Sequence, residues 1–310
     1  MKVLLAGATG TIGRAVLDRL LADGHSVTCL SRSRRALPDG VGRLEADLTK
    51  PNALLPDALE GVETVMSCMA SRSGAPADAW AVDHDAHLAL LRAAQSAGVR
   101  HFVLLSAICV QKPLLEFQRA KLAFEQELTQ SGLRHSIIRP TAFFKSLSGQ
   151  VARVQAGKPF LLFGDGRLTA CKPISDRDLA AYIVGCLDDP ARVGVLPIGG
   201  PGPAITPRAQ ADMLFEMTGK APKFRSLPVG VMDAIIAGLS LGGRMVPGLR
   251  AKADFARIGR YYATESMLVW DGSRYDADAT PEFGTDTLRD HYAALLRGDA
   301  VTDLGDHAVF

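Results

Sequence analysis

A glycine-rich segment at residues 7–13 constrains the fold of this chain more than any other feature. It reads Gly-Ala-Thr-Gly-Thr-Ile-Gly, follows the apolar residues 3–6 and precedes an amphipathic segment at residues 14–21. Glycines let a strand turn sharply into a helix, and the N-terminal amides and dipole of that helix bind a pyrophosphate. The G-x-x-G-x-x-G spacing differs from the generic G-x-G-x-x-G, but its place between strand and helix favours a dinucleotide site over an ordinary turn. We expect six residues to contact the dinucleotide: Gly7, Thr9, Gly10, Thr11, Ile12 and Gly13.

Composition narrows the class of protein. The 310 residues are 47% hydrophobic, enough for one large domain with an additional lobe. A net charge of +2 without long runs of like charge argues against a nucleic-acid partner. Five scattered cysteines, with no C-x-x-C pair, indicate neither a disulfide framework nor a zinc site, and they favour the cytoplasm. The first expected strand begins at residue 2, which leaves no room for a leader peptide.

The most apolar later segment, residues 227–249, is expected not to cross a membrane. Asp233, Arg244 and two prolines interrupt it, so its charge-free core is too short. Its alternatives are ordinary core packing, the wall of a substrate pocket, or peripheral contact with a membrane surface.

The second expected strand, residues 26–30, carries the signal for cofactor choice. It is followed by Arg32 and Arg35, and no acidic residue appears before Asp39. An acid here would bind the ribose 2′-hydroxyl of NAD, whereas arginines suit the 2′-phosphate of NADP. We therefore predict NADPH, with Arg32 as the first choice of contact. The end of the third expected strand, residues 42–48, places Asp47 and Leu48 at the adenine edge, although Asp47 fits a helix N-cap equally well.

Strands and helices alternate through most of the chain. Further strands are expected at residues 62–68, 101–106, 136–139 and 195–198, with helices at 79–97 and 176–187 among them. This order predicts an α/β fold with a doubly wound parallel Rossmann sheet, whose carboxyl edge brings Gly7, Cys68 and Ser106 together. Residues 1–200 are expected to bind NADP, with an excursion at 146–170. Residues 201–310 are expected to form a smaller, mainly helical substrate-binding lobe.

One histidine pair is a candidate metal site. His84 and His87 lie three residues apart, with Asp83 and Asp85 beside them. No other histidine or cysteine has a matching spacing, and acids in a first helical turn are ordinary partners of the helix dipole. We predict no metal site.

The glycine loop, Ser106 after the fifth strand and Lys121 on the next helix together resemble the extended or atypical short-chain dehydrogenase/reductases, a group with NmrA-like members. That family uses a Tyr-x-x-x-Lys pair, whereas this chain has Phe117 four residues before Lys121. The resemblance implies that Lys121 binds the nicotinamide ribose and is the catalytic residue. Because a phenyl ring has no hydroxyl, the usual acid of carbonyl reduction is missing, and reduction of a carbon–carbon double bond remains open.

Longer segments carry a more specific resemblance, at residues 102–121, 139–147, 163–166, 170–175, 196–202 and 258–267. They are similar to the NADPH-dependent divinyl chlorophyllide a 8-vinyl reductases of chlorophyll and bacteriochlorophyll synthesis. The resemblance implies a tetrapyrrole substrate, 3,8-divinyl chlorophyllide a or its protochlorophyllide form, which carries its own magnesium. It also implies a photosynthetic bacterium as the source, since the plant members begin with a transit extension.

The same resemblance implies further site residues. Ser106 and Pro140 are expected at the cofactor, and the expected substrate contacts are Cys109, Phe117, Phe143, Phe144 and Lys145. Core packing stays open as the alternative for Cys109 and the three phenylalanines. Cys109, Lys121, Lys145 and bound water stay open as proton donors, and the oligomeric state is left open. Two other functions remain: an NADP-binding sensor or non-catalytic subunit, and a reductase of another conjugated alkene or quinone.

Overall fold

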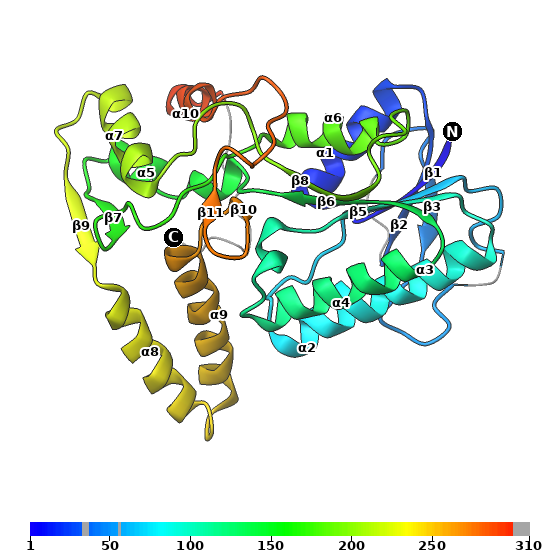
Figure 1. The fold of residues 1–310 in the computed structure, drawn as a ribbon, viewed down its shortest axis with the longest axis horizontal. Helices are drawn as coiled ribbons and strands as arrows, with labels where there is room; N and C mark the ends of the chain where they lie inside the picture. The colour runs from blue at the N-terminus through cyan, green and yellow to red at the C-terminus, as the bar shows by residue number, and fades with distance from the viewer. Residues whose placement is uncertain (33–36, 55–56, 300–310) are drawn as a thin grey trace. The chain divides into compact units, whose positions relative to one another are not determined.

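The computed structural model describes residues 1–32, 37–54 and 57–299 (Figure 1). The chain divides into two compact units. The first comprises Met1–Arg72, Pro76–Pro140 and Asp176–Pro197, and the second comprises Ser73–Ala75, Thr141–Ser175 and the described residues from Ile198 onward. The segment that groups with the C-terminal part is thus 141–175, where the sequence suggests an excursion at 146–170. A role of the second unit in substrate binding stays a prediction.

The first unit is built on a sheet that has seven strands within the described ranges. Across the sheet they are β3 (Gly42–Glu45), β2 (Ser26–Ser31), β1 (Lys2–Ala6), β4 (Thr64–Ser67), β5 (His101–Leu105), β6 (Arg134–Pro140) and β8 (Gly194–Ile198). Strands β1 to β6 run parallel. Residues 3–6 of β1 are all buried, as expected for a strand covered on both faces. The predicted doubly wound parallel sheet is confirmed, and its strand order reverses between β1 and β4.

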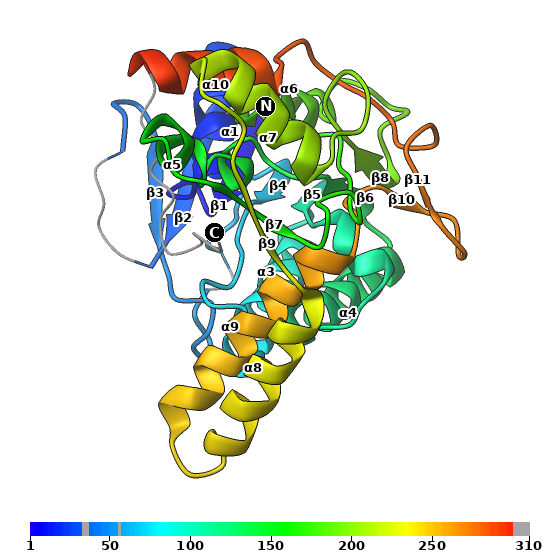
Figure 2. The same ribbon diagram turned by 90° about the vertical axis from the view of Figure 1, so that its left-hand side faces the viewer.

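Helices cover both faces of this sheet (Figures 1 and 2). On one face lie α1 (Thr11–Ala22) and α6 (Asp176–Gly185), and on the other lie α2 (Pro76–Ala79), the π-helix η1 (Trp80–Ala86), α3 (His87–Ser96) and α4 (Glu116–Gln130). A short 3-10 turn, η2 (Ile108–Gln111), follows β5. The single helix expected at residues 79–97 is therefore wrong in one respect, because its first two turns are wound as a π-helix. Such wide turns are frequent at functional sites.

The core of the first unit lies between the sheet and the helices. Its members are apolar residues of the strands and of the inner faces of α3 and α4, including Leu4, Val65, Leu90, Phe102 and Phe124. Their burial fixes the strand ends, and therefore the loops that follow them, in position.

The second unit is mainly helical, as predicted. Its elements are η3 (Lys145–Leu147), α5 (Val151–Gln155), β7 (Phe160–Phe163), α7 (Pro207–Thr218), β9 (Phe224–Leu227), α8 (Val229–Gly242), α9 (Pro247–Thr264), β10 (Val269–Trp270), β11 (Tyr275–Asp276) and α10 (Leu288–Arg297). Strands β7 and β9 pair in parallel, and β10 and β11 pair antiparallel. A second core joins α5, β7, α7 and α10, with Tyr292 at its centre donating a 2.8 Å hydrogen bond to the carbonyl of Leu147. Among the described residues, no helix is both long and apolar enough to cross a bilayer.

Candidate active site

The glycine turn has the geometry that a bound dinucleotide requires. Gly7 has φ of +83°, and a Cβ there would lie 2.6 Å from the carbonyl carbon of Cys68. A Cβ on Gly13 would lie 2.0 Å from the carbonyl oxygen of Gly7. Only glycine allows β1, β4 and α1 to approach this closely. Ile12 and Gly13 are buried and anchor the turn, whereas Thr9, Gly10 and Thr11 are exposed at the start of α1. The residues present therefore fit a pyrophosphate at this helix N-terminus.

The ends of β2 and β3 place Arg32 and Asp47 near each other. Arg32 is exposed directly after β2, and Asp47 follows β3. The hydroxyl of Thr49 donates a 2.7 Å hydrogen bond to Asp47 Oδ1, and this bond is the main cause of a lowered Asp47 pKa, to which the charge of Arg32 contributes. Asp47 closes a turn at residues 47–50 rather than capping a helix. Leu48 is buried in the core, and Arg35 lies outside the described residues.

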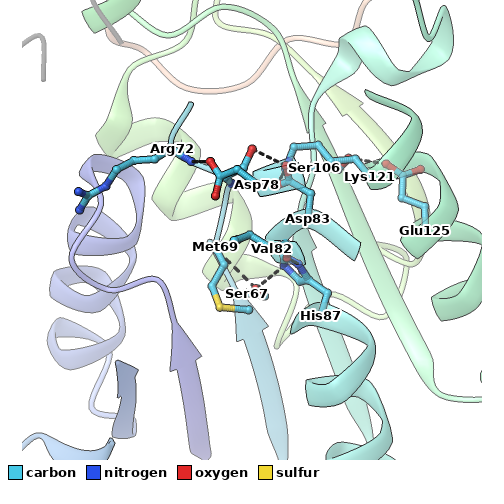
Figure 3. A network of polar contacts seen from close by, with 11 residues as sticks. Ser67, Met69, Arg72, Asp78, Val82, Asp83, His87, Ser106, Lys121 and Glu125 are labelled. Atoms are coloured by element: carbon cyan, nitrogen blue, oxygen red, sulfur yellow. Dashed lines mark hydrogen bonds and ion pairs between the residues drawn. The ribbon is translucent and has the colours of Figure 1, made fainter. Parts of the chain in front are cut away.

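Lys121 on α4 is held by a buried acid (Figure 3). Its Nζ lies 2.9 Å from Oδ1 of Asp83, a side chain with 0% exposure, while the Lys121 side chain is 12% exposed. Asp83 also accepts hydrogen bonds from the backbone N–H of Ser71, at 3.1 Å, and from the Ser71 hydroxyl, at 2.6 Å. Three donors therefore satisfy this carboxylate, and it fixes the ammonium group at one place.

A second buried pair lies beside the first. Ser67 Oγ, at the end of β4, lies 2.8 Å from His87 Nε2, and His87 Nδ1 lies 2.8 Å from the carbonyl oxygen of Val82 (Figure 3). A carbonyl only accepts, so Nδ1 carries the proton and Nε2 accepts from the serine hydroxyl. Burial, with a contribution from the nearby Lys121 charge, lowers the pKa of His87 to about 4. His87 is therefore neutral at physiological pH.

Ser106 joins a third set of buried polar groups. Its hydroxyl donates to Oε1 of Glu125 on α4, and the same carboxylate accepts from Arg139 Nε at 3.1 Å. Glu125 is one helical turn after Lys121, so both side chains lie on one face of α4. A small pocket in the first unit is lined by Asp83, His87, Leu104, Leu105, Ser106, Lys121 and Phe124. Asp83 and Glu125 are thus each paired with a cation, Lys121 and Arg139 respectively.

Phe117 and Cys109 flank the start of α4. Phe117 is half-buried, one turn before Lys121. The buried Gln118 accepts hydrogen bonds through Oε1 from the backbone N–H groups of Leu114, at 2.7 Å, and Leu115, at 2.9 Å. Burial raises the pKa of the Cys109 thiol to about 11, although a hydrogen bond with Gln118 acts in the opposite direction. Cys109 therefore stays protonated at neutral pH.

The remaining predicted residues divide between the units. The structure brings Gly7 and Cys68 together, and it places Pro140 at the buried end of β6. Phe143, Phe144 and Lys145 belong to the second unit. Phe143 and Lys145 are half-buried, whereas Phe144 is 4% exposed and packs in the core beside His291, with ring centroids 5.4 Å apart. Among the described residues no cluster of three or more histidine, cysteine or acidic side chains is arranged to hold a metal, and the expectation of no metal stays a prediction.

Sequence reasoning misses the acids behind this site. In the sequence, Asp83 stands out only as a possible metal ligand beside His84. No sequence pattern predicts that Glu125 pairs with Arg139. One available signal is the stripe on residues 117–128, where Gln118, Lys121 and Glu125 interrupt an otherwise apolar face of α4. Polar residues in a buried stripe need partners, and those partners mark a network.

Comparisons with known proteins agree with this geometry. A family model described as NAD(P)H-binding matches residues 7–190. The structure of the NADPH-dependent quinone oxidoreductase QOR2 from Escherichia coli, complexed with NADPH, is similar with a TM-score of 0.67 over 94% of this chain and 99% of that chain. Since the identity is 19%, this likeness concerns the fold alone.

Two plant relatives are much closer in sequence. The divinyl chlorophyllide a 8-vinyl-reductase of Zea mays, a chloroplastic protein, is 49% identical over 99% of this chain and 82% of its own length. The Arabidopsis thaliana protein of the same name, also chloroplastic, is 44% identical over 99% of this chain and 79% of its own length.

These relatives contradict the expected location. They are chloroplastic plant proteins, so the prediction of a cytoplasmic protein from a photosynthetic bacterium is wrong. Its physical basis was weak, because scattered reduced cysteines fit any reducing compartment. The same relatives nevertheless match this chain over 99% of its length at 44–49% identity, which shows the family. The chain belongs to the divinyl chlorophyllide a 8-vinyl-reductase family of NAD(P)H-binding oxidoreductases.

Proposed function

We propose that this protein reduces the 8-vinyl group of 3,8-divinyl chlorophyllide a to an ethyl group with NADPH. The observation that carries the proposal is the 44–49% identity to reductases of that name over 99% of the chain. Phe117 supports it, because a site without the usual phenolic acid suits an alkene better than a carbonyl.

NADPH, when bound, supplies a hydride from C4 of its nicotinamide, and the protein positions the cofactor and the substrate for the transfer. The amides at the start of α1 bind the pyrophosphate, with Gly7 and Gly13 allowing its close approach. Arg32 binds the 2′-phosphate through charge-assisted hydrogen bonds and selects NADPH over NADH. Lys121 binds the nicotinamide ribose, and Asp83 positions its ammonium group.

The substrate needs less acid assistance than a ketone would. The vinyl group is conjugated with the macrocycle, so the negative charge left by hydride addition spreads over the ring, and a proton then completes the ethyl group. Cys109 carries a proton at neutral pH, as a donor must. Lys121, Lys145 and bound water are the other candidate donors.

For the pigment, we propose Phe117, Phe143 and Lys145 as contacts. Phe117 and Phe143 offer half-buried aromatic surface, and Lys145 suits a propionate of the tetrapyrrole. Residues 201–310 contribute to the binding of this large apolar substrate. Phe144 is assigned to packing, because its ring is buried in the core of the second unit. The magnesium ion belongs to the substrate.

The test mixes purified protein with 3,8-divinyl chlorophyllide a and either NADPH or NADH. The Soret band is followed, and the product mass is measured after chromatography. A gain of two hydrogens that is faster with NADPH supports both the reaction and the cofactor choice. NADPH binding without any turnover contradicts the proposal and favours a sensor or non-catalytic subunit.

A further inference from the structure

Helices α8 and α9 form a hairpin, and the apolar side chains of α8 are not buried in a core. They lie side by side in the second unit (Figure 2). Helix α8 has a single charged residue, Asp233, and none of its 14 residues is buried. Ile235 is 51% exposed and Leu241 is 65% exposed. Helices of soluble proteins normally bury their apolar residues, so this surface is expected to have a partner.

Exposure is greatest where the two helices join. We call residues 241–252 the hairpin tip. Met245 is 89% exposed, and Val246 beside it is 51% exposed. The turn is compact, because a Cβ on Gly243 would lie 3.0 Å from the backbone nitrogen of Arg250. The tip therefore presents large apolar side chains on a convex, tightly closed turn.

The charges of the hairpin are segregated. Arg244, Arg250 and Lys252 are exposed at the tip, and their side chains form no hydrogen bond or ion pair with the rest of the described chain. No acidic residue occurs between Asp233 and Asp254. Nearer the base, arginines are neutralised instead: Arg260 pairs with Asp233, and Arg257 pairs with Asp254 at 2.6 Å. Within the described hairpin, the tip is where apolar exposure coincides with uncompensated positive charge.

We propose that the hairpin tip inserts into the interfacial region of a bilayer that contains anionic lipids. Leu241, Met245 and Val246 enter the boundary between headgroups and acyl chains, and the three basic side chains contact the headgroup phosphates. Peripheral insertion is the mode that fits, since no described helix can span the bilayer. A convex basic tip complements an anionic surface, whereas association of two copies would bring like charges together. This inference does not depend on vinyl reduction.

The test is flotation of the purified full-length protein with vesicles, in the absence of pigment and cofactor. Vesicles of phosphatidylcholine mixed with phosphatidylglycerol are expected to bind the protein, and binding is expected to weaken as salt is added. The triple variant Arg244→Gln/Arg250→Gln/Lys252→Gln is expected to bind about 100-fold more weakly, from about fivefold for each basic residue. The pair Leu241→Ser/Met245→Ser is expected to lose binding at both low and high salt.

A matched control removes the same charge elsewhere in the second unit. Lys220, Lys223 and Arg225 are exposed around the start of β9, and their replacement by glutamine is expected to leave vesicle binding within about twofold. Equal weakening by both triple variants would mean a general effect of net charge and would overturn the proposal. Failure of the native protein to float, with a dimer that the Leu241→Ser/Met245→Ser variant dissociates, would assign the tip to a second copy. Circular dichroism and urea unfolding confirm that each variant remains folded.

Discussion

The ammonium group of Lys121 lies 2.9 Å from the carboxylate of Asp83, whose side chain has no exposed surface. Asp83 lies in the π-helix η1, and Lys121 lies on α4, so one ion pair joins two helices on the same face of the sheet. The Ser71 backbone and hydroxyl complete the set of donors around the acid. Lys121 is therefore a fixed charge rather than a mobile surface lysine.

Asp83→Asn is expected to destabilise the fold. The change keeps the shape of the side chain but leaves Lys121 without its counter-ion and presents an amide to three donors. Removing one partner of a buried pair costs about 3 kcal/mol, so the free energy of unfolding measured in urea is expected to fall by about that amount. Asp85→Asn, at a 67% exposed side chain in the same element, is the control and is expected to change it by less than about 0.5 kcal/mol.

Lys121→Met is expected to weaken NADPH binding. The loss of a charge-assisted hydrogen bond to the ribose corresponds to a Kd that rises about 10- to 100-fold, measured by quenching of protein fluorescence. The double variant Asp83→Asn/Lys121→Met is expected to lose less free energy of unfolding than the two single variants lose together, because both changes remove the same ion pair. Strict additivity would show that the two side chains act separately.

Arg32→Ser is expected to shift cofactor choice. Without the guanidinium, the 2′-phosphate loses a charge-assisted contact, so KM for NADPH is expected to rise about tenfold or more. Steady-state rates with both cofactors provide the measurement. NADH lacks the phosphate and serves as the internal control, with KM expected to stay within about twofold. A parallel rise for both cofactors would place Arg32 outside the 2′-phosphate site.

Phe117→Tyr is expected to restore the missing acid. Residues 117 and 121 are one helical turn apart, so a hydroxyl would be added on the same face as the lysine. The variant is expected to gain measurable reduction of simple ketones with NADPH while vinyl reduction declines. Assays of both substrates on one preparation, with Phe117→Leu as the control for lost aromatic surface, measure the exchange. Ketone reduction by the unaltered protein at the same rate would contradict the role given to residue 117.

Stability is expected to fall as the pH drops from about 6.5 to about 4. Burial lowers the pKa of His87 to about 4, so between these values the unfolded chain binds a proton that the folded chain does not. This histidine therefore contributes its full stability above pH 6.5 and loses roughly 2 kcal/mol of it by about pH 5. His101, whose pKa burial also lowers to about 4, acts in the same direction.

Urea unfolding at neutral pH and at about pH 5 measures this loss, and His87→Gln is expected to reduce it by roughly 2 kcal/mol. Glutamine retains a polar group but does not titrate in this range. An unchanged pH dependence in the variant would show that His87 has the same pKa in the folded and the unfolded protein, and would contradict the shift.

Much of the first unit could be predicted because its signals are local. The glycine turn is recognised from neighbouring residues alone, and the strands are recognised as short runs of apolar residues. The reversal of strand order between β1 and β4 follows from the usual topology of such sheets. Phe117 could likewise be read against Lys121, because four residues separate two side chains on one helical face.

The partners of the buried charges could not be predicted in the same way. Asp83 and Lys121 are 38 residues apart, and Glu125 meets Arg139 across a helix and a strand. Sequence spacing says nothing of such contacts. The π-winding of Trp80–Ala86 was also hidden, because a helical pattern does not distinguish a wide turn from an ordinary one. The exposure of α8 could not be decided from the sequence, since an apolar run of this kind is typical of a core helix as well as of a pocket wall or a membrane-contacting surface.

The side chain of Gln118 determines where α4 begins, through its two bonds to the backbone of Leu114 and Leu115. The start of the helix thus depends on an amide rather than on the ring at position 117. We therefore expect an exchange of phenylalanine for tyrosine at that position to leave the lysine in register. If Phe117→Tyr gains ketone reduction, the step between alkene and carbonyl chemistry amounts to one oxygen atom and requires no rebuilding of the scaffold.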